Sequence, residues 1–368
     1  MITRKRILYG ICGIGLGHTY RQLPLIEYFA RMHDVVIFAY GESFSYYRRH
    51  FGHTANITVL EVSVPFYVGG PEGIDFAATA ERSEGGTQNV TLVNARAIAE
   101  MKSVIGRPDI VLSDYEPTSA LVAYAFDVPL ITIDQQSKYL MGGFPEEING
   151  FTSLDEVERL RMFFPKAEAR IACSFFVVDE ASDDNVTVVP PVLRPSIQNL
   201  IRSEDESPSI LVYFSSQQPF TQSLGEILTA LARLPQTSFH MFIPTQVTHT
   251  DVVPDNVTIY CHGDNRWNDL LSRASGIVST AGHGLLSEAM HLGVPVYAVP
   301  LGIYEQQMNA QVIDEHEFGV AQPSIQVDRL AYFIASIPRF RENIERDDAV
   351  LLRGSGEEEI IRLVESYL

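Results

Sequence analysis

The sequence predicts an α/β protein with two doubly wound domains in series. A chain of 368 residues is longer than one ordinary hydrophobic core accommodates. A buried strand followed by a turn of small residues and a helix begins near residue 7, and the same pattern restarts near residue 210. With 46% hydrophobic residues, the chain has enough apolar material for both cores.

The first element is a buried strand, residues 7–12, which runs directly into Gly13-Ile14-Gly15-Leu16-Gly17-His18. A helix is expected from there to about Arg31. The third glycine comes too early for the dinucleotide-binding spacing G-x-G-x-x-G, which weakens a dehydrogenase interpretation. What the turn offers instead is a histidine lined by glycines.

His18 has a chemical role available to it at this turn. Imidazole has an ordinary pKa near 6.5, so at neutral pH it is mostly able to accept a proton from an attacking hydroxyl. A general base in the right position contributes about 10²–10⁴ in rate. The alternative is that His18 caps the helix or lines a phosphate site.

A carboxylate is expected close to this histidine. The remaining strands of the first domain are expected at residues 35–40, 56–64, 110–112, 128–133 and 186–189. In a parallel sheet, Asp114 lies at the same edge as the glycine turn, where it can bond to His18, fix its tautomer and stabilise the imidazolium. The alternative is that Asp114 caps the next helix, residues 118–126.

Polar and aromatic residues near the same sheet edge predict a binding site for the molecule that supplies the attacking hydroxyl, which we call the acceptor. Residues 65–89 form a glycine-rich, aromatic segment that is too long for a plain connection, with disorder as the alternative. Acids and amides at strand ends suit a polyhydroxylated ligand. The candidate acceptor-binding residues are Phe66, Tyr67, Glu116, Asp134 and Gln135.

A proline-rich run at residues 190–195 predicts the domain boundary at Pro195. The first domain then spans residues 1–195 and the second 196–350, with a terminal helix in 351–368. Residues 210–214 are the first strand of the second domain, and Ser216 and Gln217 lie in the loop after it.

The loop after residues 276–278 carries the clearest ligand signal in the second domain. Its small residues let a ligand approach the backbone, and the following helix start presents N–H groups and partial positive charge that suit a diphosphate. Glu288, one turn into that helix, can accept the hydroxyls of a ribose. The expected buried side of the helix consists of Leu285, Leu286, Ala289 and Met290. The alternative is an ordinary strand-to-helix turn.

A second polar loop follows the next strand, residues 296–299. It carries Glu305 and Gln306 just before a helix, and these side chains can bond to the hydroxyls of a hexose. Loops after successive parallel strands open onto the same sheet edge, where α/β proteins bind ligands.

At these residues the chain resembles the GT-B glycosyltransferases. The resemblance rests on Gly282-His283-Gly284, Ser287-Glu288-Ala289, Gly293-Val294-Pro295 and Glu305-Gln306-x-x-Asn309-Ala310. The order is similar to that of the UDP-glycosyltransferases and the N-acetylglucosaminyl transferase of peptidoglycan synthesis. It covers about residues 258–320, and Gly15-x-Gly17-His18 resembles the acceptor-side loop of the family. Ser113-Asp114-x-Glu116-Pro117 and Asp134-Gln135-Gln136-Ser137 together resemble a prokaryotic branch of these transferases.

The resemblance implies two Rossmann-like domains facing across a cleft, with the acceptor on the first, the donor on the second and the last helix returning to the first. It implies His18 as the general base, with Asp114 as its partner. A loop around Gly263 would hold the nucleobase of the donor. Trp267 either stacks on that nucleobase or packs on its own helix. The donor-binding residues it implies are Gly17, Ser216, Gln217, Gly263, Gly282, His283, Gly284, Leu285, Ser287, Glu288, Glu305 and Gln306.

The implied reaction moves a hexose from a nucleoside diphosphate sugar, with UDP as the expected nucleotide, to an acceptor hydroxyl with inversion. The nucleotide sugar is a co-substrate, and no other cofactor is implied. No Asp-x-Asp metal clamp lies near the donor loops, so metal-independent transfer is expected. The alternatives are a nucleotide-sugar 2-epimerase of the same fold and a non-catalytic nucleotide-sugar-binding protein.

The composition of the chain limits the classes of molecule that it is expected to bind. A net charge of −19 repels polyanions, so a glycan, a lipid-linked sugar or a small molecule is favoured over modified DNA as acceptor. No apolar run approaches the roughly 20 residues that span a bilayer, and no signal-peptide core begins the chain, so a cytoplasmic protein is expected. Arg4-Lys5-Arg6 is expected to be a solvent-exposed segment before the first strand, with peripheral membrane contact as the alternative.

Overall fold

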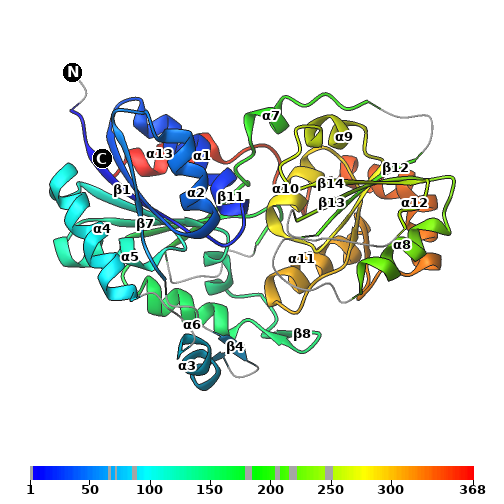
Figure 1. Ribbon diagram of the computed structural model, residues 1–368, viewed down its shortest axis with the longest axis horizontal. Coiled ribbons are helices and arrows are strands. Elements are labelled where there is room, and N and C mark those ends of the chain that lie inside the picture. Colours follow the sequence, from blue (N-terminus) through cyan, green and yellow to red (C-terminus); the bar gives the residue numbers. More distant parts are fainter. Residues whose placement is uncertain are drawn as a thin grey trace. The chain divides into compact units, whose positions relative to one another are not determined.

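A computed structural model (Figure 1) describes residues 3–64, 68–70, 73–84, 89–178, 185–203, 208–214, 222–244 and 252–368. The chain divides into two compact units. Unit 1 contains Met1–Ser174, Val178–Arg194 and Ser355–Leu368, and unit 2 contains Phe175–Val177 and Pro195–Gly354. Phe66, Tyr67, Ser216 and Gln217, four of the predicted site residues, lie outside the described residues.

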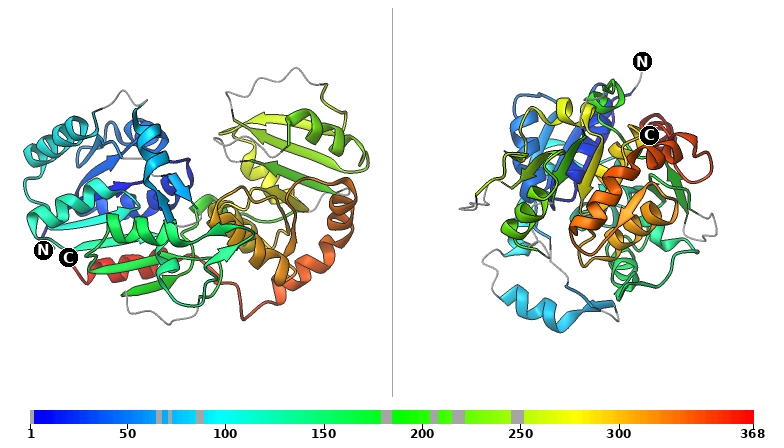
Figure 2. Two further views of the ribbon diagram at one scale, coloured as in Figure 1. Left: turned by 90° about the horizontal axis from the view of Figure 1, so that it is seen from below. Right: turned by 90° about the vertical axis from the view of Figure 1, so that its right-hand side faces the viewer.

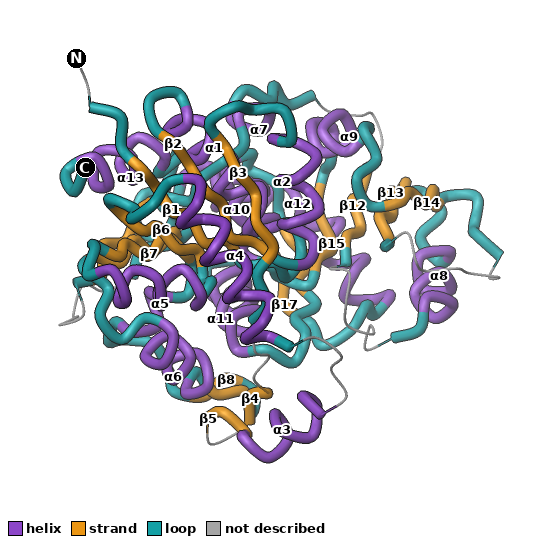
Figure 3. The backbone as a smooth tube through the Cα atoms, turned by 60° about the vertical axis from the view of Figure 1, so that its left-hand side comes forward, coloured by secondary structure: helices purple, strands orange, loops and turns teal. Residues whose placement is uncertain are grey.

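Unit 1 is built on a parallel sheet in the order β11-β10-β7-β6-β1-β2-β3. Its strands are β1 (Arg6–Ile11), β2 (Asp34–Ala39), β3 (Ile57–Glu61), β6 (Ile110–Asp114), β7 (Leu130–Asp134), β10 (Ala169–Cys173) and β11 (Val186–Val189). Figure 3 shows β2, β1, β6 and β7 as neighbours. The chain winds outward in opposite directions from β1 and β6, and ligands of doubly wound folds bind at such a reversal.

Helices cover both faces of this sheet because alternate strand residues point to opposite sides. The helices are α1 (Gly17–Ala30), α2 (Gly41–Phe51), α3 (Phe76–Glu84), α4 (Val90–Val104), α5 (Pro117–Phe126), α6 (Leu154–Phe163) and α13 (Glu357–Glu365). Ile7 and Tyr9 pack with residues of α1, α2 and α13, whereas Leu8 packs with residues of α4, α5 and α6. The unit also contains the short elements β4 (Val68–Gly70), β5 (Gly73–Asp75), η1 (Ser137–Leu140), β8 (Glu147–Ile148) and β9 (Phe151–Thr152).

The C-terminal helix α13 belongs to unit 1, although the chain passes through unit 2 before reaching it. In Figure 2 this red helix lies with the blue and cyan elements of unit 1. Ile360, Ile361 and Val364 are part of the unit 1 core. Tyr28 on α1 donates a hydrogen bond to Glu365 Oε1 at 2.7 Å.

Unit 2 repeats the architecture with a parallel sheet in the order β14-β13-β12-β15-β16-β17. The strands are β12 (Ser209–Tyr213), β13 (Ser238–Ile243), β14 (Val257–Cys261), β15 (Gly276–Ser279), β16 (Val296–Ala298) and β17 (Gly319–Ala321). The helices are α7 (Pro195–Gln198), α8 (Leu224–Ala232), α9 (Trp267–Arg273), α10 (His283–His291), α11 (Tyr304–Glu315) and α12 (Val327–Arg346). The reversal of winding lies between β12 and β15.

Helix α12 differs from the pattern of the sequence, which predicts two helices at residues 326–337 and 341–352. The structure has one helix that continues through Pro338 and ends at Arg346. Its buried stripe of Leu330, Phe333, Ile337, Phe340 and Ile344 runs along the whole length. Packing of this stripe outweighs the hydrogen bond that a proline removes. Among the described helices, none combines the length and apolarity required to cross a membrane.

Candidate active site

The loop between β1 and α1 directs His18 to the carboxyl edge of the unit 1 sheet. A Cβ atom on Gly13 would lie 2.0 Å from the carbonyl oxygen of Tyr40, and Gly15 has a φ of +68°. Only glycine tolerates both the close contact at position 13 and the positive φ at position 15 at low energetic cost. Helix α1 then begins at Gly17 with Leu16 as N-cap, so His18 lies inside the first turn and does not cap the helix.

Strand order brings Asp114 to this histidine. Strands β1 and β6 are neighbours, with Ile11 opposite Asp114. The Nδ1 atom of His18 lies 2.9 Å from Oδ1 of Asp114. Asp114 is fully buried, whereas 14% of the His18 side chain is exposed. In the tautomer with a proton on Nδ1, that proton is directed at the carboxylate, and Nε2 is the atom that can accept a proton.

The two pKa shifts agree with a charged partnership. Burial lowers the pKa of His18, but the Asp114 carboxylate and then Cys12 outweigh burial and raise this pKa. Burial raises the pKa of Asp114, but the charges of Arg21 and His18 outweigh it and lower that pKa. Asp114 therefore remains ionised, and its charge helps to raise the pKa of His18 to about 10, which favours the imidazolium at neutral pH.

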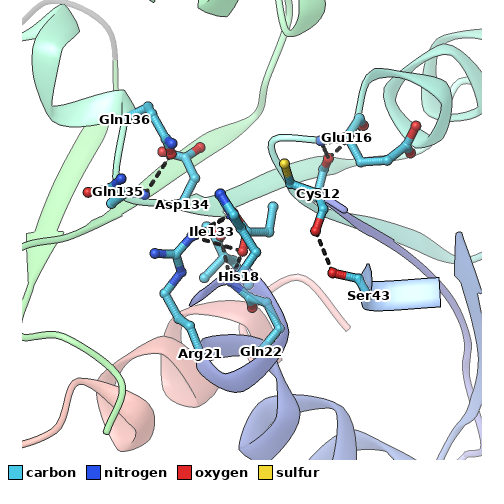
Figure 4. Close-up of polar contacts among 12 residues, drawn as sticks. Cys12, His18, Arg21, Gln22, Ser43, Glu116, Ile133, Asp134, Gln135 and Gln136 are labelled. Atoms are coloured by element: carbon cyan, nitrogen blue, oxygen red, sulfur yellow. Dashed lines mark hydrogen bonds and ion pairs between the residues drawn. The ribbon is translucent and has the colours of Figure 1, made fainter. Parts of the chain in front are cut away.

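Two further residues of α1 bind the same carboxylate, and neither is among the residues predicted from the sequence. Arg21 Nη2 lies 2.9 Å from each oxygen of Asp114 and 2.8 Å from His18 Nδ1. Gln22 Nε2 donates to Asp114 Oδ2 at 2.8 Å and to the carbonyl of Ile133 at 2.9 Å. Figure 4 shows both side chains beside His18. Their positions three and four residues after His18 place them on the same helix face, which is the signal that could have identified them.

Glu116 and Asp134, which are predicted to bind the acceptor, both bond to neighbouring groups of unit 1. Both are fully buried. The carboxylate of Glu116 accepts the backbone N–H groups of Thr118 and Ser119, each at 2.7 Å, and so caps α5. This cap also excludes the alternative role of Asp114. Asp134 accepts the backbone N–H and the hydroxyl of Ser137. These bonds stabilise the segments that follow β6 and β7.

Gln135 remains a candidate for acceptor binding. It lies after β7, at the same sheet edge as Asp114. Its side chain is 4% exposed, and its Oε1 has no hydrogen-bond partner among the described residues. A buried amide oxygen without a partner is costly, and a ligand hydroxyl can satisfy it.

In unit 2, the turn after β15 begins α10. Ala281 has a φ of +60°, which is rare for a residue with a Cβ atom, and Gly282 is the N-cap. A Cβ atom on Gly282 or Gly284 would meet nothing within 4 Å, so the start of the helix is uncrowded. Glu288 is half-buried one turn later.

The buried face of α10 differs from the prediction. Leu286, Ala289 and Met290 are buried as expected, but Leu285 is only half-buried. His283 and Ser287 are buried instead. His283 packs on the ring of Phe175, with 5.7 Å between ring centroids. The Ser287 hydroxyl donates to the carbonyl of His283 at 2.8 Å, so it serves its own helix.

Glu305 and Gln306 lie in the first turn of α11, not in the loop before it. Gln306 is buried, and its Oε1 accepts the backbone N–H of Leu301 at 2.8 Å, whereas Glu305 is half-buried. Asn309, a buried member of the same motif, donates from Nδ2 to the carbonyl of Ala281 at 3.0 Å. This bond ties α11 to the turn before α10.

The segment after β14 contains Gly263, which is exposed and has a φ of +83°. Trp267 begins α9 and packs edge-on against Phe242 and Tyr213, at centroid distances of 4.8 and 5.3 Å. It therefore packs on strand aromatics. In the part of the chain that the structure describes, no group of three His, Cys, Asp or Glu side chains is arranged to hold a metal ion.

Comparisons with known proteins agree with this architecture. A family model described as glycosyl transferase family 1 matches residues 5–338. An uncharacterized glycosyltransferase of Methanosarcina acetivorans is 26% identical over 340 residues, with 85% of this chain and 82% of that protein covered. The glycotransferase of kitacinnamycin has a TM-score of 0.68 at 15% identity, with 100% of both chains covered. Arabidopsis thaliana UGT89C1, complexed with UDP-L-rhamnose, has a TM-score of 0.63 at 18% identity, with 99% of both chains covered. The structural likeness shows the GT-B fold.

Proposed function

Because the chain belongs to glycosyl transferase family 1, we propose that it transfers a hexose from a nucleoside diphosphate sugar to an acceptor hydroxyl with inversion at the anomeric carbon. The observation that carries this proposal is the contact of 2.9 Å between His18 and the buried Asp114. A histidine held by a carboxylate, with its second nitrogen directed elsewhere, suits removal of a proton from a hydroxyl.

In the proposed step, the neutral form of His18 takes the proton of the acceptor hydroxyl at Nε2 as the hydroxyl oxygen attacks the anomeric carbon. The bond between that carbon and the diphosphate oxygen breaks, and the electron pair leaves with the nucleoside diphosphate. Asp114 stabilises the imidazolium that forms. Gln135, whose buried Oε1 lacks a partner among the described residues, is proposed to orient the acceptor.

Unit 2 is proposed to hold the donor. The start of α10 offers backbone N–H groups at His283 and Gly284, and the helix dipole favours the negative charge that grows on the departing diphosphate. Glu288 is proposed to bind the ribose, and Glu305 the sugar. With a helix start in this role, transfer is proposed to need no divalent metal. UDP is the proposed nucleotide, which the UDP-L-rhamnose complex of the Arabidopsis neighbour supports.

The decisive experiment first identifies the donor and then removes the base. A thermal-shift screen across nucleoside diphosphates and their sugars should find a ligand that stabilises the protein by about 2.7 kcal/mol at 100 times its dissociation constant. With that donor, His18→Ala should lower kcat about 10²–10⁴-fold and leave the donor affinity near that of the wild type. His53→Ala, which changes an exposed histidine, is the matched control. A His18→Ala variant with unchanged kcat would contradict the proposed base.

The same assay separates the alternatives. Incubation with the nucleotide sugar alone should leave it unchanged, since an epimerase would convert it without an acceptor. The relatives described above carry glycosyltransferase names, which does not favour an epimerase. A non-catalytic binding protein would show the thermal shift without turnover on any acceptor. Turnover should persist in EDTA, and its loss would contradict metal independence.

A further inference from the structure

Arg21 is a buried cation inside the pair that the proposed mechanism uses. Its side chain is 8% exposed and lies on α1, one turn after His18. The same Nη2 atom approaches both oxygens of Asp114 and the Nδ1 atom of His18. Arginine and histidine thus share one carboxylate.

The charges of this group decide what the histidine can do. With a neutral imidazole, the carboxylate and the guanidinium cancel, and the buried group has no net charge. Protonation of His18 leaves a buried net charge of +1, with imidazolium and guanidinium nitrogens only 2.8 Å apart. Like charges in direct contact disfavour the second protonation, and low polarity strengthens their repulsion.

We propose that Arg21 is a positioning residue of the His18–Asp114 pair, whose guanidinium neutralises the shared carboxylate and so limits how tightly His18 retains a proton. This inference rests on the proposed role of His18 as a base. A lone carboxylate partner would hold the imidazole in its charged form, which cannot accept a proton. Arg21 offsets that attraction and keeps a larger fraction of His18 in the neutral form.

Other groups around the pair act on the same proton. They are Tyr9 on β1, Cys12 after β1, Asp134 at the end of β7 and Cys173 at the end of β10. The Cys12 sulfur lies 3.2 Å from the hydroxyl of Tyr40. Burial raises the pKa of Asp134, of Cys173 and of Tyr9. A substitution of Arg21 leaves these groups unchanged. The resulting change in the pKa of His18 therefore reports the effect of the guanidinium alone.

The test is an NMR titration of His18 in ¹³C,¹⁵N-histidine-labelled protein, with the signal assigned by its loss in His18→Gln. Arg21→Gln removes the charge and should raise the pKa of His18. At a pH well below this pKa, a pKa higher by one means a neutral fraction about tenfold lower. Arg21→Lys retains a charge and should stay closer to the wild type. Thermal unfolding of each variant checks that it is folded, and Arg21→Met replaces Arg21→Gln if the glutamine variant does not fold.

A His18 pKa that is unchanged or lower in the folded, uncharged variant would overturn the proposal and leave Arg21 a purely structural role. The titration needs neither donor nor acceptor, so it can succeed or fail independently of the transferase assignment. Where turnover is measurable, the pH profile of kcat/KM should move to higher pH in Arg21→Gln in parallel with the titration. Donor affinity should not change.

Discussion

At the scale of single residues, three similar acids at strand ends have three different roles. Asp114 binds a histidine and an arginine, Glu116 caps a helix, and Asp134 closes a turn. All three are fully buried, so their roles follow from the donors that surround each carboxylate. Asp114 differs because its partners are charged, which lowers its pKa despite burial.

Asp114 should make stability depend on pH. Its folded pKa is lowered, so its contribution is present above the unfolded pKa, near 3.9, and is lost as the pH falls through the folded pKa. The folded pKa of His18 is raised, so its contribution is present below about 6.5 and is lost as the pH rises through the folded pKa. The stability difference between wild type and Asp114→Asn should therefore be largest between about pH 4 and 6.5.

Urea unfolding across this range measures the difference, which should be about 3–5 kcal/mol for loss of one partner from a buried pair. Asp255→Asn, which changes an exposed aspartate, is the control. A difference that is constant with pH would mean that Asp114 stabilises unit 1 by packing alone.

At the scale of elements, the turn between β1 and α1 depends on glycine for a steric reason that is specific to each position. Gly13 faces the Tyr40 carbonyl, whereas a Cβ atom on Gly17 would have nothing within 4 Å. Glycine is required at position 13 because two chain segments are in contact there. At position 17, glycine leaves open space at the start of the helix. Both look alike in the sequence.

Gly13→Ala should therefore destabilise the protein, whereas Gly17→Ala should not. Overpacking against backbone costs about 1–3 kcal/mol or more, because a carbonyl cannot move aside as a side chain can. Alanine at the first position of a helix is favoured over glycine by up to about 1 kcal/mol. Thermal unfolding of both variants measures this, and equal melting temperatures would show that the turn adjusts to a Cβ atom.

At the scale of the whole molecule, unit 1 is assembled from distant parts of the chain. Residues 355–368 return to it after unit 2, and α13 completes the face of the sheet that α1 and α2 also cover. Unit 1 therefore lacks part of its core until the end of the chain is available. The hydrogen bond from Gly356 N–H to the carbonyl of Pro191 closes the returning segment onto the same unit.

Truncating a buried residue of α13 should destabilise unit 1. Ile360→Ala removes a fully buried side chain and should cost about 2–5 kcal/mol. Arg362→Ala on the exposed side of the same helix should change stability by less than about 0.5 kcal/mol. Denaturant unfolding followed by fluorescence gives both values. If the two variants were equally stable, α13 would be a surface addition and not part of the core.

The sequence by itself determined the two α/β patterns and the place of His18, because strands, glycine turns and amphipathic helices depend on residues that are close together in the sequence. It also contained the motif order that marks α10 and α11, although it predicted Glu305 and Gln306 in the loop before α11 and not in its first turn. The sequence also predicted Asp114 as the partner of His18, with a helix cap as the alternative role. Only the tertiary structure decided between these two roles, because that depends on the adjacency of β1 and β6, about a hundred residues apart. The burial of Arg21 has the same origin, because its guanidinium is directed inward at the carboxylate of Asp114.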